Sequence, residues 1–191
     1  MDLILDTDRL RLRPLEESDV DLGLEMLTDP QVMRYVGQAM SAEAVRAEMP
    51  IVTQRAMGGA VGIWCVTVKE SGEKLGTGIL LPLPIEEDDT DFDLVVNDDV
   101  ANSEIEVGYL LKPGAWGRGY ATEVCRRLLQ FAFEETQLAE VVATFDPENL
   151  ASRHVLLKCG LVDHGLRRAY AETVPDFRIT REEWLASHPG K

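Results

Sequence analysis

The alternation of apolar and polar residues predicts most of the strands of this 191-residue chain. Residues 9–15 read RLRLRPL, in which leucines alternate with arginines as a half-buried strand requires. The β-branched and aromatic runs at 60–68 and 74–83 are separated only by KESGE, which predicts a hairpin. Further strands are predicted at 104–111 and 140–146, and the segments LVDHGLRRAY and DFRITREEW predict a closing hairpin that turns helical at its end.

Helices are predicted where the apolar positions recur every three to four residues. From Ala121 onward, apolar and polar residues separate onto opposite faces, which predicts an amphipathic helix. Ser18 is expected to cap a helix that ends at Leu27. Asn149 is expected to cap or precede a helix that runs to Cys159, just before a glycine that stops it.

The order of these elements predicts the fold class. A further helical stretch begins at Ser41, where Pro50 is expected to kink or divide it. The complete order is therefore strand, two helices, three strands, helix, strand, helix and two strands. It predicts one α/β (α+β) domain over residues 1–191, with a mixed sheet rather than a doubly wound parallel one. A chain of this length suits one domain and is short for two.

An acidic stretch at about 84–103 separates two of the predicted strands. It has few apolar residues, so we expect a disordered or loosely ordered insertion that is solvated. Asp88, Asp89, Asp91 and Asp93 cluster in it and leave a calcium loop as an alternative. The glycine and terminal glutamate of an EF-hand are missing, however, and a solvated loop is the preferred interpretation.

Composition narrows the class of protein. The apolar fraction of 45% and the charged fraction of 28% are typical of a soluble globular protein, and no apolar run approaches the ~18 residues of a membrane span. The net charge of −15 argues against nucleic-acid binding and is compatible with a cationic substrate such as an amine, although acid also simply aids solubility. The opening MDLILDTDRLRLRP lacks the order of a signal peptide, so a cytoplasmic protein is expected.

Neither cysteine nor histidine usage predicts a metal site. Cys65, Cys125 and Cys159 are scattered and form no C-x-x-C pattern, which favours reduced core thiols over disulfides or zinc. The three histidines are dispersed, and no spacing among them suggests metal ligands or a catalytic triad.

The segment KPGAWGRGYATEV, residues 112–124, joins a predicted strand to the amphipathic helix. A strand, a glycine-rich turn and a helix N-terminus together present unpaired backbone N–H groups and partial positive charge, which suit a phosphate. A P-loop would need a lysine that is absent, and a Rossmann fingerprint would need glycine or alanine where Thr122 stands. Neither of these two phosphate-binding motifs is therefore predicted.

The segment does resemble the acyl-CoA pyrophosphate loop of the GNAT N-acetyltransferases, whose pattern is [Q/R]-x-x-G-x-[G/A]. Gly119 and Ala121 take the last two positions and Trp116 the first, a departure typical of the branch of ribosomal-protein N-terminal acetyltransferases (RimJ/RimL type). The segments TDRLRLRPLEESDVDLGLEMLTDPQVMRYVG, EVGYLL, ENLASRHVLLKCGL and FRITREEW also look like that branch, in its order. The resemblance covers nearly the whole chain except the acidic insertion.

The resemblance implies a GNAT fold, with a mixed and mostly antiparallel central sheet flanked by helices. It implies acetyl-CoA as acyl-donor substrate, no metal, and transfer of the acetyl group to a primary amine by direct attack on the thioester. A protein N-terminal α-amine fits the branch, and a small amine, an amino acid or an antibiotic is the alternative acceptor. Dimers are common in the family, so a homodimer is one implied oligomeric state.

Catalytic roles also follow from the resemblance. Glu106 matches the acidic position that often serves as base or water-positioning group, and Glu104, on the same face of the strand, is the reserve candidate. Leu156 stands where many GNAT enzymes have an acid tyrosine, while Ser152 matches a serine that hydrogen-bonds the leaving thiolate. A rim position for the glutamates and a first-turn position for the serine explain them equally without catalysis.

The resemblance places acyl-CoA against the glycine-rich loop and its neighbours. A backbone N–H near Leu110 to Leu111 is expected to face the thioester carbonyl. The residues assigned to the cofactor are Leu110, Leu111, Trp116, Gly117, Arg118, Gly119, Tyr120, Ala121, Thr122, Asn149 and Lys158. Two other functions remain open: a non-catalytic acyl-CoA-binding module, which the missing tyrosine favours, and an interaction protein that uses the acidic stretch at 86–99.

Overall fold

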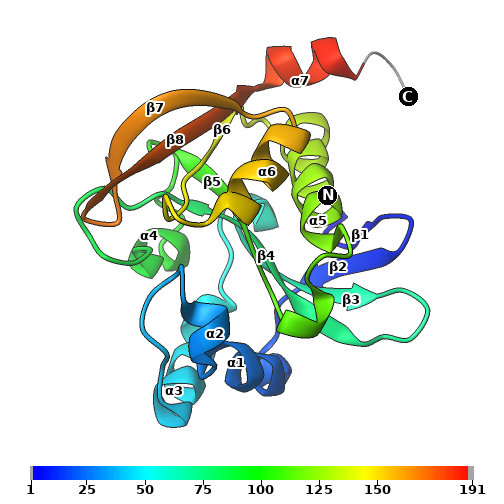
Figure 1. The fold of residues 1–191 in the computed structure, drawn as a ribbon, viewed down its shortest axis with the longest axis vertical. Coiled ribbons are helices and arrows are strands. Elements are labelled where there is room, and N and C mark those ends of the chain that lie inside the picture. Colours follow the sequence, from blue (N-terminus) through cyan, green and yellow to red (C-terminus); the bar gives the residue numbers. More distant parts are fainter. Residues whose placement is uncertain (1, 189–191) are drawn as a thin grey trace.

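An eight-stranded sheet forms the centre of the computed structural model, which describes residues 2–188 (Figure 1). The strands are β1 (Leu5–Asp6), β2 (Leu10–Pro14), β3 (Gly62–Val68), β4 (Lys74–Pro82), β5 (Ile105–Leu111), β6 (Glu140–Ala143), β7 (Val162–Ala169) and β8 (Glu172–Thr180). Their order in the sheet is β1-β2-β3-β4-β5-β6-β8-β7, and only β5 and β6 pair in parallel. The expectation of a mixed, mostly antiparallel sheet is confirmed.

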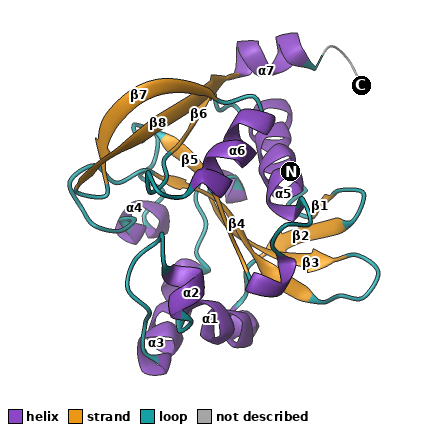
Figure 2. Ribbon diagram, viewed as in Figure 1, coloured by secondary structure: helices purple, strands orange, loops and turns teal. Residues whose placement is uncertain are grey.

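Helices cover both faces of this sheet (Figure 2). They are α1 (Val20–Leu27), α2 (Pro30–Met33), α3 (Ala42–Val52), α4 (Phe92–Val96), α5 (Tyr120–Gln130), α6 (Leu150–Lys158) and α7 (Arg181–Ser187). A π-helical turn, Phe131–Glu135, extends α5, and short 3-10 turns lie at 17–19, 57–59 and 113–115. The helices α5 and α6 pack on one side of the sheet, whereas α1, α2 and α3 gather on the other side (Figure 1).

The glycine at position 78 lets α5 approach β4 closely. A Cβ on Gly78 would lie 2.8 Å from Cγ1 of Val124, so a larger residue would push α5 outward. Tyr109 is the partner of Gly78 across the β4–β5 ladder, so it shares the face that α5 covers. Leu110 packs instead into the cluster that contains Met49 of α3. Successive side chains of β5 therefore point to different helical layers.

The two parallel strands share a very short ladder. The structure pairs β5 with β6 only at Glu106 and Val142. The rest of β5, up to Leu111, has no strand partner on that edge among residues 2–188. An opening in the middle of a sheet exposes backbone groups that a ligand can use.

The acidic insertion is more ordered than its composition suggests, and the expectation of a disordered or loosely ordered loop is wrong there. Its middle forms α4, which Asp91 caps by accepting a hydrogen bond from the N–H of Asp93 at 3.0 Å. Val95 and Val100 are buried in the main core. Two apolar anchors and one cap are enough to fix a short helix when the rest of the protein supplies the core.

Other differences occur at helix ends. Ser18 is no cap, because it lies within a 3-10 turn whose capping box is formed by Glu16 and Asp19. Pro50 does not divide α3, which continues through it and ends at Val52. The elements β1, α2 and α4 were not predicted at all, since each has five residues or fewer and shows no periodicity of its own.

The three cysteines, Cys65, Cys125 and Cys159, are all buried and free, which confirms the prediction of core thiols. Between residues 2 and 188, no helix combines the length and the apolar character needed to cross a membrane.

Candidate active site

The glycine-rich segment forms an open cradle at the start of α5. Gly117 and Gly119 have φ values of 71° and 78°, a left-handed conformation that glycine adopts most easily. The first bond of the helix runs from the N–H of Glu123 to the carbonyl of Gly119 at 3.1 Å. The N–H groups of Tyr120, Ala121 and Thr122 therefore have no acceptor within the helix and are available to an anion.

Two side chains hold this cradle in place. The indole Nε1 of Trp116 donates to the carbonyl of Leu111 at 2.7 Å and so ties the loop to the end of β5. Arg9 donates from Nη1 to the carbonyl of Arg118 at 3.0 Å and from Nε to Glu123 at 2.7 Å. The sequence did not predict a role for Arg9. This residue directly precedes β2 and meets the loop only in the folded chain. Arg118 itself is exposed beside the cradle.

The register of β5 decides which of its backbone groups face the opening. The N–H of Leu83 donates to the backbone carbonyl of Glu104, and the N–H of Lys112 donates to the carbonyl of Leu75, both at 2.9 Å. Hydrogen-bonded pairs alternate along an antiparallel ladder, so the even-numbered residues of β5 direct their backbone groups to β4. The N–H of Leu111 therefore points to the opening and that of Leu110 to β4. This register favours Leu111 as the oxyanion donor.

A tyrosine and a serine meet on the α5 side of the opening. The hydroxyl of Tyr109 lies 3.1 Å from Oγ of Ser152, and Asn149 caps α6 by accepting from the N–H of Ser152 at 3.1 Å. Burial raises the pKa of Tyr109 above its ordinary value, so the phenol stays protonated and can donate. Leu156, where the family tyrosine would be, is buried in the core. Tyr109 of β5 thus supplies a phenol on the side where α6 has Leu156 instead of a tyrosine.

The far end of α6 lies beside the first turns of α5. Arg126 donates from Nη2 to the carbonyl of Lys158 at 2.7 Å, and Sγ of Cys159 lies 3.6 Å from the carbonyl of Thr122. Lys158 is exposed at this junction. The backbone of Lys158 is therefore held against the second turn of α5.

Glu106 lies at the point where β5 and β6 separate. Its side chain is only 4% exposed, and Oε1 accepts a hydrogen bond from the hydroxyl of Tyr170. Burial raises the pKa of the Glu106 carboxyl to about 7, although the hydrogen bond from Tyr170 and the charge of Arg167 oppose this rise. A carboxyl with a pKa near neutrality can both accept and release a proton at pH 7.

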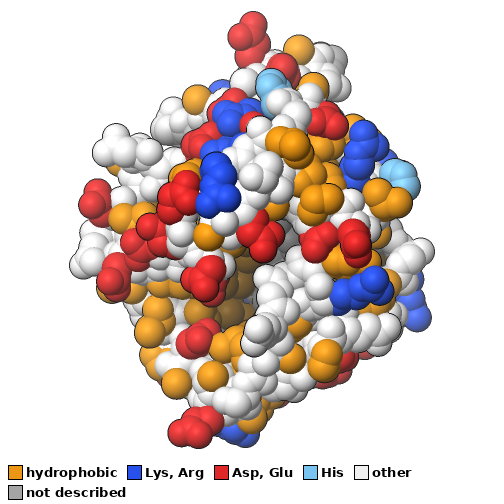
Figure 3. All heavy atoms as spheres, turned by 60° about the vertical axis from the view of Figure 1, so that its left-hand side comes forward, with side chains coloured by type: hydrophobic (Ala, Val, Ile, Leu, Met, Phe, Trp, Pro, Cys, Tyr) orange, Lys and Arg blue, Asp and Glu red, His pale blue; other side chains and the backbone are white. Residues whose placement is uncertain are grey.

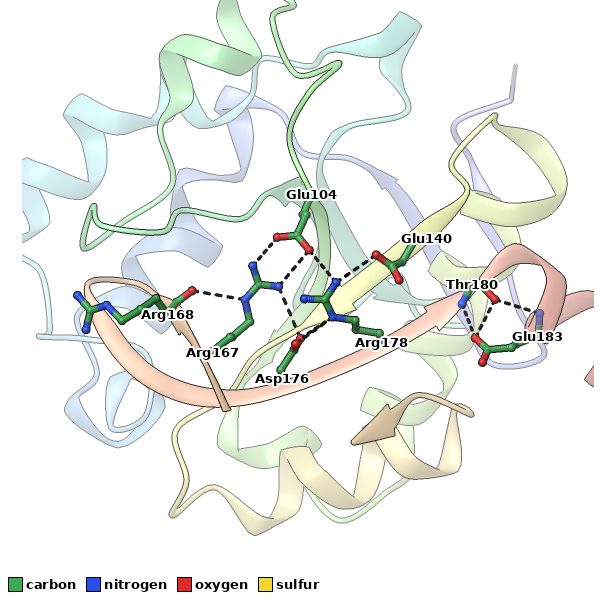
Figure 4. Close-up of polar contacts among 8 residues, drawn as sticks. All are labelled: Glu104, Glu140, Arg167, Arg168, Asp176, Arg178, Thr180 and Glu183. Atoms are coloured by element: carbon green, nitrogen blue, oxygen red, sulfur yellow. Dashed lines mark hydrogen bonds and ion pairs between the residues drawn. The ribbon is translucent and has the colours of Figure 1, made fainter. Parts of the chain in front are cut away.

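Glu104, just before the start of β5, has a different environment (Figure 4). It forms ion pairs with Arg167 and with Arg178, the latter at 3.0 Å between Oε1 and Nη1. Hydrogen bonding from Arg167 lowers the pKa of Glu104 below its ordinary value. Asp176 shares both arginines, so Glu104 belongs to a network of fixed charges. A carboxylate held in this way is a weak base.

Carboxylates from three separate elements gather on the side of Glu106. Burial is the largest cause of the raised pKa of both Glu106 and Glu48, the latter on α3. Asp89 of the insertion is close enough for its negative charge to raise both pKa values further. Figure 3 shows a hollow with hydrophobic atoms inside it and several acidic side chains around its rim. Asp89 therefore adds negative charge near both Glu48 and Glu106.

The structure brings the predicted residues together in two groups. The cradle, from Trp116 to Thr122, joins Lys158 on one flank of α5. Ser152 meets Tyr109 on the face of β5 that α5 covers, and Glu106 lies on the opposite face of the same strand. Neither Tyr109 nor Tyr170 is among the site residues that the sequence predicted.

Comparison with known proteins identifies the family of this chain. The model of the acetyltransferase (GNAT) domain matches residues 9–162. FsC-acetyl coenzyme A-N(2)-transacetylase of Aspergillus fumigatus is 31% identical in an alignment of 192 positions, which spans 95% of this chain and 77% of that protein. The spermidine N-acetyltransferase of Vibrio cholerae, solved with CoA and spermine, has a TM-score of 0.72 at 17% identity, over 94% of this chain and 99% of that one.

A ribosomal L7/L12 alpha-N-protein acetyltransferase (RimL), solved in complex with CoA, has the same fold. Its TM-score is 0.69 at 14% identity, over 93% of this chain and 97% of that one. The family model spans most of the chain, and the fungal relative matches nearly all of it. The chain therefore belongs to the GNAT family of acetyltransferases and is an N-acetyltransferase.

Proposed function

We propose that this N-acetyltransferase moves the acetyl group of acetyl-CoA to a primary amine by direct attack of the amine on the thioester. The observation that carries the proposal is the arrangement around the open edge of β5. Glu106 lies on one face of the strand, and Tyr109 with Ser152 lies on the other. A base on the acceptor side and hydrogen-bond donors on the thiolate side are what this reaction needs.

Glu106 removes a proton from the amine, directly or through a water molecule. A lysine-like amine with a pKa of roughly 10 is almost fully protonated at pH 7, so a base is needed to expose its lone pair. The nitrogen then attacks the thioester carbon, and the negative charge that develops on oxygen is stabilised by the N–H of Leu111. The raised pKa of Glu106 suits a group that must take up a proton at this pH.

Ser152 hydrogen-bonds the sulfur as the carbon–sulfur bond breaks. The hydroxyl of Tyr109 lies against Oγ of Ser152, and it can donate to that oxygen while Ser152 donates to the thiolate. The sulfur takes its proton from this chain of two hydroxyl groups. Solvent then returns a proton to the chain. The phenol of Tyr109 thus compensates for the leucine at position 156.

The cradle holds the pyrophosphate of acetyl-CoA. The free N–H groups of Tyr120, Ala121 and Thr122 donate to it, and the absence of side chains at Gly117 and Gly119 leaves room for it. Arg118 and Lys158, both exposed, lie where they can meet the phosphates. The side-chain amide of Asn149 contacts the pantetheine arm, for which the NH₂ group is available because the oxygen caps α6.

The acceptor that we propose is cationic, with a protein N-terminal α-amine as the first candidate. The carboxylates of Glu48, Asp89 and Glu106 on the acceptor side support a positive charge. The RimJ/RimL type of loop supports a protein N-terminus. The names of the relatives describe other acceptors too, so a small amine, an amino acid or an antibiotic is the alternative. For each of these acceptors we propose that the reaction takes place in the cytoplasm.

The test is a thiol-release assay with acetyl-CoA and a panel of peptides that differ at the N-terminus, polyamines and aminoglycosides. We expect release with at least one amine class and a large loss in the Glu106→Gln variant. Leu156 favours a second candidate, a non-catalytic acyl-CoA sensor. That candidate would be supported if acetyl-CoA raised the melting temperature while no amine in the panel was acetylated.

A further inference from the structure

The turn between β7 and β8 has an unusual sequence for its shape. Tyr170 and Ala171 form a two-residue hairpin turn, and both have a φ of 53°. A turn with two left-handed residues normally contains asparagine, aspartate or glycine, because a bulky side chain is strained there. A tyrosine at such a position points to a use for its side chain.

The side chain of Tyr170 reaches from this turn to Glu106, 64 positions earlier in the chain. Its hydroxyl donates to Oε1 of Glu106, and its ring packs on the cluster that includes Leu83 and Val142. Among residues 2–188, no donor reaches the second oxygen, Oε2, of this carboxylate. One oxygen of Glu106 is therefore occupied by the phenol, and the other is available.

The turn is itself fixed against the end of β4. The N–H of Tyr170 donates to the carbonyl of Pro84 at 3.2 Å, and the N–H of Ala171 donates to that of Ile85 at 3.1 Å. These bonds use the backbone of the first residues of the acidic insertion. The position of the phenol is therefore set by two elements that are anchored in the sheet, and not by a free loop.

We propose that Tyr170 is a positioning residue for Glu106, which holds one oxygen of the carboxylate so that the other faces the acceptor amine. The proposal rests on the proposed function, because it concerns the same base. A carboxylate in a nearly buried site has two oxygens and two rotatable bonds close to the reacting atoms, and a fixed donor removes that freedom. Tyr170 acts through Glu106 and needs no contact with either substrate.

The electrostatic consequence has a definite sign. The charged groups that face Glu106 are Arg167 on β7 and Asp89 in the insertion, besides the phenol of Tyr170. Hydrogen bonding by the phenol stabilises the ionised carboxylate and so lowers the pKa of Glu106, against the larger effect of burial. Burial and the charge of Glu106 raise the pKa of Tyr170, so the phenol remains a donor throughout the working range.

The decisive experiment is a carbon-13 NMR titration of glutamate side chains in the wild type and in Tyr170→Phe. The resonance of Glu106 is assigned by its disappearance in Glu106→Gln. We expect its midpoint to move upward by at least about half a pH unit in Tyr170→Phe, because the ring remains and only the donor is lost. An unchanged midpoint overturns the proposal, whether or not an acceptor is known.

Kinetics give a second readout. The acid limb of kcat/KM should move upward with the NMR midpoint, so that activity at pH 7 falls by about two- to fivefold and recovers at higher pH. In the background of Glu106→Gln, the second change Tyr170→Phe should have no further effect, since the tyrosine acts only through the glutamate. A full additional loss in the double variant would contradict the proposal.

Ala171→Gly is the matched control. It relaxes the same turn and leaves the phenol and both backbone N–H groups in place. Neither the titration of Glu106 nor the pH profile should change. If Ala171→Gly reproduces the effects of Tyr170→Phe, the turn acts through its shape and the proposal fails. If Glu106→Gln retains full turnover while the NMR shift is present, the assigned base is wrong but the link between Tyr170 and Glu106 stands.

Discussion

Glu104 directly precedes β5 and Glu106 lies within it, yet these two residues have opposite electrostatic environments. Glu104 is paired with Arg167 and Arg178, which keep its carboxyl ionised. Glu106 is buried at the point where β5 and β6 separate, and within residues 2–188 its one hydrogen-bond donor is the neutral phenol of Tyr170. Two identical side chains therefore differ in basicity because one is paired with a network of arginines and the other is buried.

Substitution of Glu106 by glutamine should abolish most of the acetylation, whereas the same change at Glu104 should not. We expect kcat/KM to fall by roughly 10²- to 10⁴-fold in Glu106→Gln at pH 7, the usual range for loss of a general base. Glu104→Gln should lose less than about tenfold, because it changes the charge network and leaves the base. Thiol release measured across pH 5.5–8.5 checks both, and near-normal turnover in Glu106→Gln would exclude that residue as base.

Gly119 should be required for binding of acyl-CoA. Alanine at this position strains a φ of 78° and adds a methyl group to the cradle. We expect the Kd for CoA, measured by calorimetry, to rise by about tenfold or more, because the N–H groups at the start of α5 turn away from the phosphates.

Gly72→Ala is the control for backbone strain. Gly72 has a φ of 73° in the turn between β3 and β4, and a Cβ there would meet nothing within 4 Å. Both alanine variants should lose a similar, small amount of thermal stability, on the order of 1 kcal/mol. If Gly72→Ala weakened CoA binding as much as Gly119→Ala, the effect would be general destabilisation and not loss of the cradle.

The parts of this fold that depend on local pattern could be predicted from the sequence. The amphipathic period after Ala121 and the alternation at residues 9–15 reflect burial of one face, which is a property of neighbours in the chain. The cap at Asn149 needs only a side chain and the N–H three residues on, and it is confirmed. The glycine-rich turn between β5 and α5 could be predicted from local sequence in the same way.

The residues that complete the site could not be predicted from the sequence, because they come from segments that are far apart in the chain. Arg9 meets Arg118 across 109 positions, and Tyr170 meets Glu106 across 64. No local pattern marks a tyrosine in a tight turn as the partner of a buried carboxylate. The helix α4 was missed for a related reason, because Val95 is buried by elements outside its own acidic segment.

Ser152 and Tyr109 should contribute to catalysis and little to the binding of acetyl-CoA. We expect Ser152→Ala to lower kcat about tenfold with a small change in KM for acetyl-CoA, because its hydroxyl meets the sulfur only as charge develops. Tyr109→Phe should cost less, and the two changes together should cost less than the product of the separate effects, since the hydroxyls act in one chain of hydrogen bonds. Steady-state kinetics on the three variants check this.

Tyr35→Phe is the matched control for the loss of a phenol. Tyr35 belongs to neither the cradle nor the Tyr109–Ser152 pair, and the guanidinium of Arg34 lies 4.9 Å from the centroid of its ring. Its variant should have wild-type kinetics. Simple multiplication of the Ser152→Ala and Tyr109→Phe effects would show that the two hydroxyls act independently.

The contributions of Glu106 and Glu104 to stability should change with pH in opposite directions. The folded pKa of Glu106 is about 7, above the ordinary 4.5, so the folded chain holds this proton more tightly than the unfolded chain. The stability linked to Glu106 is therefore complete below about pH 4.5 and is lost as pH rises through 7, by at most about 3 kcal/mol. Glu106→Gln cannot ionise, so it should melt several degrees above the wild type at pH 8 and close to it at pH 5.

Glu104→Gln should show the reverse. The folded pKa of Glu104 is lowered, so its ionised form contributes stability above its ordinary pKa, and that contribution is lost as pH falls through the lowered value. This variant should melt below the wild type at pH 8, and the gap should narrow in acid. Thermal unfolding of the three proteins from pH 4 to pH 8 measures both trends. A Glu106→Gln variant that melts below the wild type at pH 8 would mean that the buried carboxylate is stabilised by its hydrogen bond more than burial destabilises it.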